Sequence, residues 1–157
     1  MSREDGRSRG SARTGFAAGA TALAIVASLS AVGVAADPAA FDKGRALFEE
    51  RRFEEAAEVF EALVAREPDV SEHHRWLGMS YGRLAEHGAW ISAPSRVSRA
   101  HDAFERALAL DPLSIPALET LMDFHENAPS LFGGDDARAE ALGVRIRQLE
   151  AREIEPF

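Results

Sequence analysis

Apolar residues recur at helical spacing from residue 41 onward, and charged residues fill most of the positions between them. Over residues 41–64 two such runs flank a polar break at Arg51-Arg52, which predicts two amphipathic helices joined by a tight turn. Pro68 ends the second helix because proline has no amide hydrogen and disfavours helical conformation in the residue before it. Ser71 is a candidate N-cap for the next helix. Since no alternating strand pattern occurs, we predict an all-helical fold.

The same helical plan returns with a period of 44 residues. Pro68, Pro112 and Pro156 lie 44 residues apart, and each follows a helical stretch. The pattern therefore predicts three helix pairs, at about residues 37–70, 71–114 and 115–157. One pair is too small to bury its apolar face alone, so neighbouring pairs must stack to build the core and form an extended binding surface.

Several residues at fixed offsets resemble the tetratricopeptide repeat, whose unit of about 34 residues favours small, large and proline residues at set positions. The first unit fits without gaps, while the second carries ten extra residues and so a longer segment between its helices. The third departs most and resembles a capping repeat. The resemblance rests on Gly44, Ala56, Phe60, Pro68, Trp76, Leu77, Gly78, Tyr81, Ala100, Phe104, Ala107, Asp111 and Pro112. It implies an all-α fold of antiparallel helix pairs, stacked as a short right-handed superhelix.

In tetratricopeptide arrays the first helices of the repeats line a concave groove that binds a protein or peptide. The resemblance assigns this groove to Phe41, Arg45, Phe48, Arg75, Met79, Arg83, Glu119, Asp123 and Glu126. Arg75 and Arg83 are expected to be exposed cations that a partner can contact. Phe41 and Arg45 replace the lysine and asparagine of the carboxylate clamp in chaperone-binding members, so clamp activity is not implied. The alternative interpretation is a solvated helix face with incidental charges.

The first 36 residues have the pattern of a secretory signal peptide. Four arginines precede an uncharged stretch at residues 15–36, which ends in the small residues Val34-Ala35-Ala36. We therefore predict cleavage after Ala36 and export, in a bacterium to the periplasm. The alternative is an uncleaved anchor in the inner membrane facing the periplasm, since about 20 apolar residues span a bilayer. The segment from Pro129 to Ala137 also looks like small exported bacterial repeat proteins of unassigned function.

Composition narrows the classes of partner. The chain has no cysteine, which excludes disulfides and thiolate metal sites. Residues 37–157 retain 14 of the 18 basic residues and 24 of the 26 acidic ones, a net charge of −10. An excess of carboxylates repels the phosphate backbone, so nucleic acid is not expected as a partner.

Two short motifs suggest chemistry that their context does not support. Residues 78–82 match the Gly-x-Ser-x-Gly pattern of a hydrolase, but a nucleophile elbow at Ser80 requires a preceding strand, and the pattern here is helical. Residues 133–136, Gly-Gly-Asp-Asp, lack the lysine of a phosphate loop and the spacing of a calcium loop. A turn followed by a helix N-cap explains them.

The five histidines predict no metal site. They are His73, His74, His87, His101 and His125. No two of them have the four-residue spacing of a helical zinc motif, so helix packing or solvent exposure is the expected role. The residual possibility is that stacking of repeats brings His74 and His125 together.

These observations predict a non-enzymatic exported scaffold without a cofactor, which binds a protein or peptide through its concave face. The alternatives are a solute-binding or transporter-associated module, an enzyme subunit that contributes no chemistry, and, remotely, a hydrolase using Ser80. A deep closed apolar pocket would favour a solute, and an open groove would favour a peptide. Trp90, in the second repeat's extra segment, either packs back onto the helices or anchors a partner.

Overall fold

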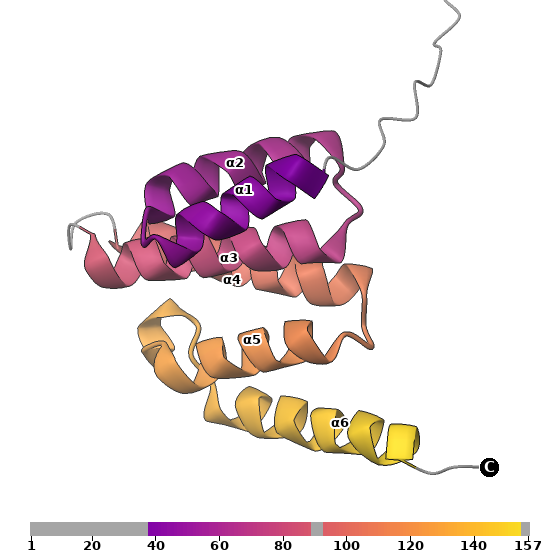
Figure 1. Cartoon of the computed structure of the whole chain (residues 1–157). Coiled ribbons are helices and arrows are strands. Elements are labelled where there is room, and N and C mark those ends of the chain that lie inside the picture. Colours follow the sequence, from indigo (N-terminus) through magenta and orange to yellow (C-terminus); the bar gives the residue numbers. More distant parts are fainter. Residues whose placement is uncertain (1–37, 89–92, 155–157) are drawn as a thin grey trace, which may run out of the picture. The chain divides into compact units, whose positions relative to one another are not determined.

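The computed structural model describes residues 38–88 and 93–154, which lie in one compact unit, Val34–Phe157. These residues form six α-helices and one 3-10 helix, without a strand among them (Figure 1). The elements are α1 Pro38–Glu49, α2 Phe53–Arg66, α3 Ser71–His87, α4 Ala93–Leu110, α5 Ile115–Asn127, η2 Ser130–Phe132 and α6 Asp136–Ile154. The predicted all-α class is confirmed. The proposed signal peptide and Trp90 lie outside the described residues.

Each helix packs against the next along the chain, from α1 through α6. Figure 1 shows consecutive helices running in alternating directions, so the predicted antiparallel pairs are α1 with α2, α3 with α4, and α5 with α6. The first helices of the pairs also contact one another, α1 with α3 and α3 with α5. They therefore form one layer of the stack, as the resemblance implied. Among the helices described, none is both long enough and apolar enough to cross a membrane.

Glycines on the first helices allow phenylalanines of the second helices to approach closely. A Cβ at Gly44 would lie only 2.7 Å from Cζ of the fully buried Phe60. A Cβ at Gly78 would collide with the ring of Phe104 and lie 3.1 Å from the carbonyl oxygen of Ala100. The small and large residues that the sequence pattern paired therefore face each other in the first two helix pairs.

Residues at helix ends account for one correct and one wrong prediction. Gly133 has a φ of 98°, and the Asp135 carboxylate accepts hydrogen bonds from the amides of Ala137 and Arg138, so the predicted turn and N-cap are confirmed. Ser71 is not an N-cap: its hydroxyl donates to the Ala107 carbonyl at 2.8 Å. A bond to the neighbouring helix has replaced the local one.

The ten extra residues of the second repeat mainly lengthen its helices. The helices α3 and α4 have 17 and 18 residues, against 12 and 14 for α1 and α2. Only residues 88–92 separate α3 from α4. The expected long segment between the two helices is therefore not formed. Most of the inserted residues are helical and lengthen α3 and α4 at one end of the second pair.

Candidate functional site

The nine predicted groove residues lie on the layer of first helices, but they do not form one uniform surface. Phe41, Arg45 and Phe48 come from α1, Arg75, Met79 and Arg83 from α3, and Glu119, Asp123 and Glu126 from α5. They divide into an internal network around Trp76, a cleft further along the helices, and exposed carboxylates on α5. Glu119 and Glu126 belong to the last group, because both are exposed and neither lines the cleft.

Trp76 is the centre of the first group. Its ring stacks on Phe60 at a centroid distance of 5.8 Å and meets the edges of Phe41 and Phe48 at 6.2 and 5.4 Å. The guanidinium of Arg45 lies 5.5 Å from the ring centroid, within cation–π distance. Phe41 and Arg45 are thus held by contacts inside the fold.

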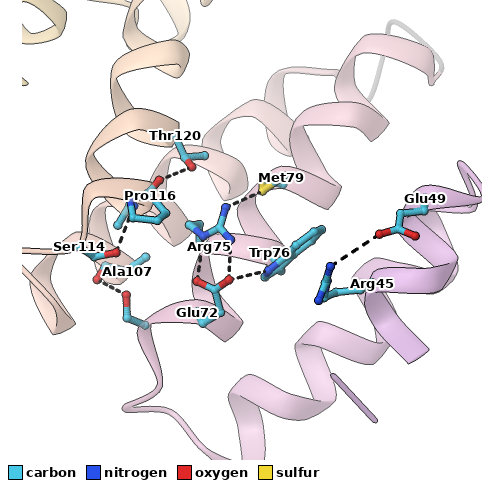
Figure 2. A network of polar contacts seen from close by, with 12 residues as sticks. Arg45, Glu49, Glu72, Arg75, Trp76, Met79, Ala107, Ser114, Pro116 and Thr120 are labelled. Carbon is cyan, nitrogen blue, oxygen red and sulfur yellow. Dashed lines mark hydrogen bonds and ion pairs between the residues drawn. The ribbon is translucent and has the colours of Figure 1, made fainter. Parts of the chain in front are cut away.

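Arg75 is also engaged within the protein, contrary to its expected role as an exposed cation. Its side chain is only 15% exposed, and it donates to the Glu72 carboxylate and to the Met79 sulfur. Figure 2 shows Glu72 between Arg75 and the indole nitrogen of Trp76, which donates to it at 2.8 Å. Hydrogen bonds from Arg75 lower the pKa of Glu72 from its usual value. The network fixes α3 against α1 and leaves Arg75 little freedom to contact a partner.

Arg83 is different, since its side chain is 51% exposed and pairs with the exposed Glu86 at 2.7 Å. It lies at the rim of a cleft of about 620 Å³. Met79, Phe48 and Asp123 also line this cleft, so four of the nine predicted groove residues share it.

The wall of the cleft is mainly apolar. It is built by Phe48, Met79, Gly82, Arg83, Ala85, Glu86, Val97, Ala100, Phe104, Thr120, Asp123, Phe124, Asn127, Ala128, Pro129 and Phe132. The ring of Phe124 packs edge-on against Phe104 at 6.0 Å, and both Phe124 and Phe132 are half-buried. Phe132 belongs to η2, the 3-10 helix inserted in the third repeat. The cleft is thus apolar within and polar at its rim.

Phe104, Phe124 and Phe132 do not stand at groove positions of a standard repeat, so the resemblance did not identify them as site residues. A signal was present: the extra residues of the second and third repeats fall between the two helices of each pair. Both insertions therefore extend the same end of the stack. The C-terminal turns of α3 and the chain from Asn127 to Phe132 line the cleft there.

A second, shallower depression of about 500 Å³ lies between α2, α3 and α4. Tyr81 donates a hydrogen bond to Glu61 and accepts one from Arg99 at 2.8 Å. Burial, together with the Glu61 carboxylate, raises the pKa of the Tyr81 phenol. The phenol therefore stays neutral and cross-links the helices.

The remaining candidates for chemistry have structural partners. Ser80 is fully buried in the middle of α3, and its hydroxyl donates to the Trp76 carbonyl at 2.9 Å, so the elbow geometry of a hydrolase is not formed. His74 contacts the Pro68 carbonyl through Nε2 at 2.8 Å. The suggested pairing of His74 with His125 is wrong, because the His125 ring lies 5.6 Å from His101 instead.

Stacked antiparallel helix pairs with small-to-large packing define a tetratricopeptide-like helical-repeat fold. Solved structures of MamA, a protein of this fold class, are similar to the chain. The MamA RS-1 ArsTM double mutant shares 21% identity at a TM-score of 0.59, with 76% of this chain and 58% of that one covered. MamA 41-end from Desulfovibrio magneticus RS-1 shares 21% identity at a TM-score of 0.58, with 75% of this chain and 58% of that one covered. The chain matches no protein-family profile and no curated protein. At this identity the similarity concerns the fold, and the chain spans just over half the length of these MamA chains.

Proposed function

We propose that this protein is a non-enzymatic scaffold of the tetratricopeptide-repeat class that binds a protein partner, with an apolar side chain of the partner inserted into the cleft. The observation that carries the proposal is the cleft itself, lined by Phe104, Phe124 and Phe132 at the extended end of the stack. Stacked repeats commonly use such concave surfaces for binding.

The binding energy would come mainly from the apolar wall. Burying one leucine or phenylalanine side chain contributes about 1.5–3 kcal/mol, roughly a fifth to a third of the free energy of a micromolar affinity. Arg83 and Asp123, of opposite charge, both line the cleft. These charges would select the orientation of a peptide by electrostatic complementarity.

A solute-binding or transporter-associated role is the second candidate, and the volume of the cleft is compatible with it. Small-molecule sites span roughly 300–1,000 Å³, a range that includes this cleft. Such sites usually enclose most of the ligand. Here Phe48, Met79 and Phe124 remain partly accessible along the cleft, which suits a segment of a larger partner better.

The proposal includes export to the bacterial periplasm, which is supported by the signal-peptide pattern of residues 1–36. The scaffold would then meet its partner in the envelope. An uncleaved N-terminal segment would instead tether the same domain to the inner membrane.

Partner capture from an envelope extract, followed by titration of the purified partner, tests the proposal. Gly82→Leu is the decisive variant: a Cβ on Gly82 would meet no described atom within 4 Å outside its own helix backbone, and Gly82 lines the cleft. The leucine should therefore fill the cleft without disturbing the fold. We expect binding to fall at least about 10-fold, equivalent to about 1.4 kcal/mol.

Charge reversal at the rim provides a second measurement with a matched control. Arg83→Glu should weaken binding, whereas Arg106→Glu should not, although the two side chains are 51% and 50% exposed. Arg106 lines the other depression and pairs with Asp69. Unchanged binding by Gly82→Leu would exclude the cleft as the site. Loss of binding in Trp90→Ala alone would place recognition in the segment around that residue.

A further inference from the structure

Three side chains that can ligate a metal come together between α4 and α5. They are His101, Glu105 and His125, whose ligand atoms all lie within 4.8 Å of one another. His101 and Glu105 are four residues apart on α4 and so share one helix face. The His101 Nε2 atom lies 3.5 Å from Oε1 of Glu105. His125 approaches from α5, the first helix of the next repeat.

His125 is positioned as metal-binding histidines usually are. The residue is 1% exposed, and its Nδ1 lies 2.9 Å from the carbonyl oxygen of Gly133. Since a carbonyl only accepts, Nδ1 carries a hydrogen, which leaves Nε2 as the nitrogen that can ligate a metal. Nε2 is buried and has no hydrogen-bond partner among the described residues. A backbone carbonyl that fixes the tautomer and orientation of the ring is the common outer-shell partner of a ligating histidine.

His101 also has a buried ring nitrogen, Nε2, without a hydrogen-bond partner among the residues described. Its ring centroid lies 5.6 Å from that of His125. Buried polar atoms without a partner are uncommon in proteins, and two imidazole nitrogens next to one carboxylate need an explanation. A bound cation would satisfy both nitrogens at once.

We propose that Nε2 of His101, Nε2 of His125 and a carboxylate oxygen of Glu105 bind a divalent transition-metal ion of the zinc class. Two imidazoles and one carboxylate suit Zn²⁺ and related ions better than Mg²⁺ or Ca²⁺, which prefer oxygen ligands. Bonds of about 2.1 Å in tetrahedral geometry place donor atoms about 3.4 Å apart. The 3.5 Å between His101 and Glu105 already meets this condition, and small rotamer changes would close the remaining distances. The fourth position is left for water.

Arg138 of α6 competes with the metal for Glu105. Its Nη2 donates to Oε1 of Glu105 at 2.7 Å, and its side chain is 51% exposed. A guanidinium beside the site lowers the affinity for a second cation, so release of Arg138 should accompany binding. The bound ion would connect the second repeat to the third, beside Phe124, whose ring lies 5.1 Å from His101. None of the three proposed ligands lines the partner cleft, although Phe124 of the cleft wall contacts both histidines.

The test uses the full chain without a polyhistidine tag, stripped with a chelator and titrated with Zn²⁺ by calorimetry. Co²⁺ serves as a second probe, because its visible absorption reports tetrahedral coordination. We expect one ion per chain and a higher melting temperature in its presence. His125→Asn is the sharpest variant: the asparagine amide can replace Nδ1 as donor to Gly133, while the ligand atom is lost. His101→Asn removes the other imidazole nitrogen.

Each asparagine variant should weaken binding by more than about 100-fold, since outer-shell partners alone contribute about 10- to 100-fold. Glu105→Gln should also weaken it, whereas Arg138→Gln should strengthen it by freeing the carboxylate. His87→Asn is the matched control, because His87 is exposed and lies at the end of α3. Absence of stoichiometric binding by the unmodified chain, or equal binding by a folded His101→Asn/His125→Asn variant, would overturn the proposal.

Discussion

The contact between Gly78 and the ring of Phe104 permits a sharp test of how the repeat is packed. Gly78→Ala adds one methyl group where the nearest atoms are Cε1 and Cδ1 of Phe104, with the Ala100 carbonyl at 3.1 Å. Phe104 is 5% exposed, and its ring also packs against Phe124 at 6.0 Å, which restrains its displacement. A matched substitution exists on the same helix: at Gly82 an added Cβ meets no described atom within 4 Å outside the helix backbone.

The two substitutions should change the free energy of unfolding in opposite directions. Alanine is favoured over glycine in a helix by up to about 1 kcal/mol, so Gly82→Ala should stabilise the domain by about 0.5–1 kcal/mol. The same gain applies at Gly78, but overpacking costs about 1–3 kcal/mol. We expect a net loss of about 1–2 kcal/mol. Phe104→Ala alone should cost about 3–5 kcal/mol, and in that background Gly78→Ala should become neutral or stabilising.

Urea unfolding followed by circular dichroism gives the four free energies of the cycle. Phe104→Leu, which shortens the side chain less, provides a milder background if the alanine variant is too unstable to measure. The interaction energy between positions 78 and 104 should reach about 1–3 kcal/mol. Additive effects, within about 0.5 kcal/mol, would show that the ring does not pack against residue 78, and the repeat register would be wrong.

Two further predictions concern pH and processing. Burial lowers the pKa of His73, and the nearby Glu67 carboxylate only partly offsets this. The pKa of histidine in the unfolded chain is about 6.5, so below that pH the unfolded state binds more protons than the folded state. The contribution of His73 to the free energy of unfolding should therefore be fully present above this pH and decrease as the pH falls. His73→Leu should show a smaller drop in melting temperature from about pH 7.5 to about pH 5.5, and an unchanged drop would contradict the assignment. Intact-mass measurement of the envelope-fractionated protein should give a chain beginning at or next to Asp37, whereas a full-length mass in the membrane pellet would indicate an anchor.

The repeat architecture could be predicted from the sequence because helix packing in the repeat places strict demands on residue size. Gly44 and Gly78 must be small for Phe60 and Phe104 to fit. The two glycines lie 34 residues apart and the two phenylalanines 44, because the second repeat carries ten extra residues between its members of the pair. Proline after each second helix marks the boundaries of the units. These constraints are local in sequence and can be recognised without coordinates.

The roles of individual polar residues were harder to predict, because several alternatives compete for each donor. Ser71 had a favourable local capping role, yet its hydroxyl bonds to Ala107 of another helix. Arg75 was assigned to the groove, but it is hydrogen-bonded to Glu72, three residues earlier on α3. Trp76 donates to the same carboxylate, so the three side chains share one region of the helix. The three-residue spacing of Glu72 and Arg75 typically allows a helical ion pair. That signal was available in the sequence, and it predicted an ion pair within α3.

The cleft and the histidine cluster both use residues that the second and third repeats add to the standard length. The lengthened end of α3 places Ala85 and Glu86 at the cleft, and the insertion after α5 supplies Phe132. The same insertion presents the Gly133 carbonyl that orients His125. Without the added residues the core would be the same, but the cleft would lack Phe132 and His125 would lack the Gly133 carbonyl. Search for function in this protein should therefore concentrate on the inserted residues, because packing requirements of the repeat already account for most of the others.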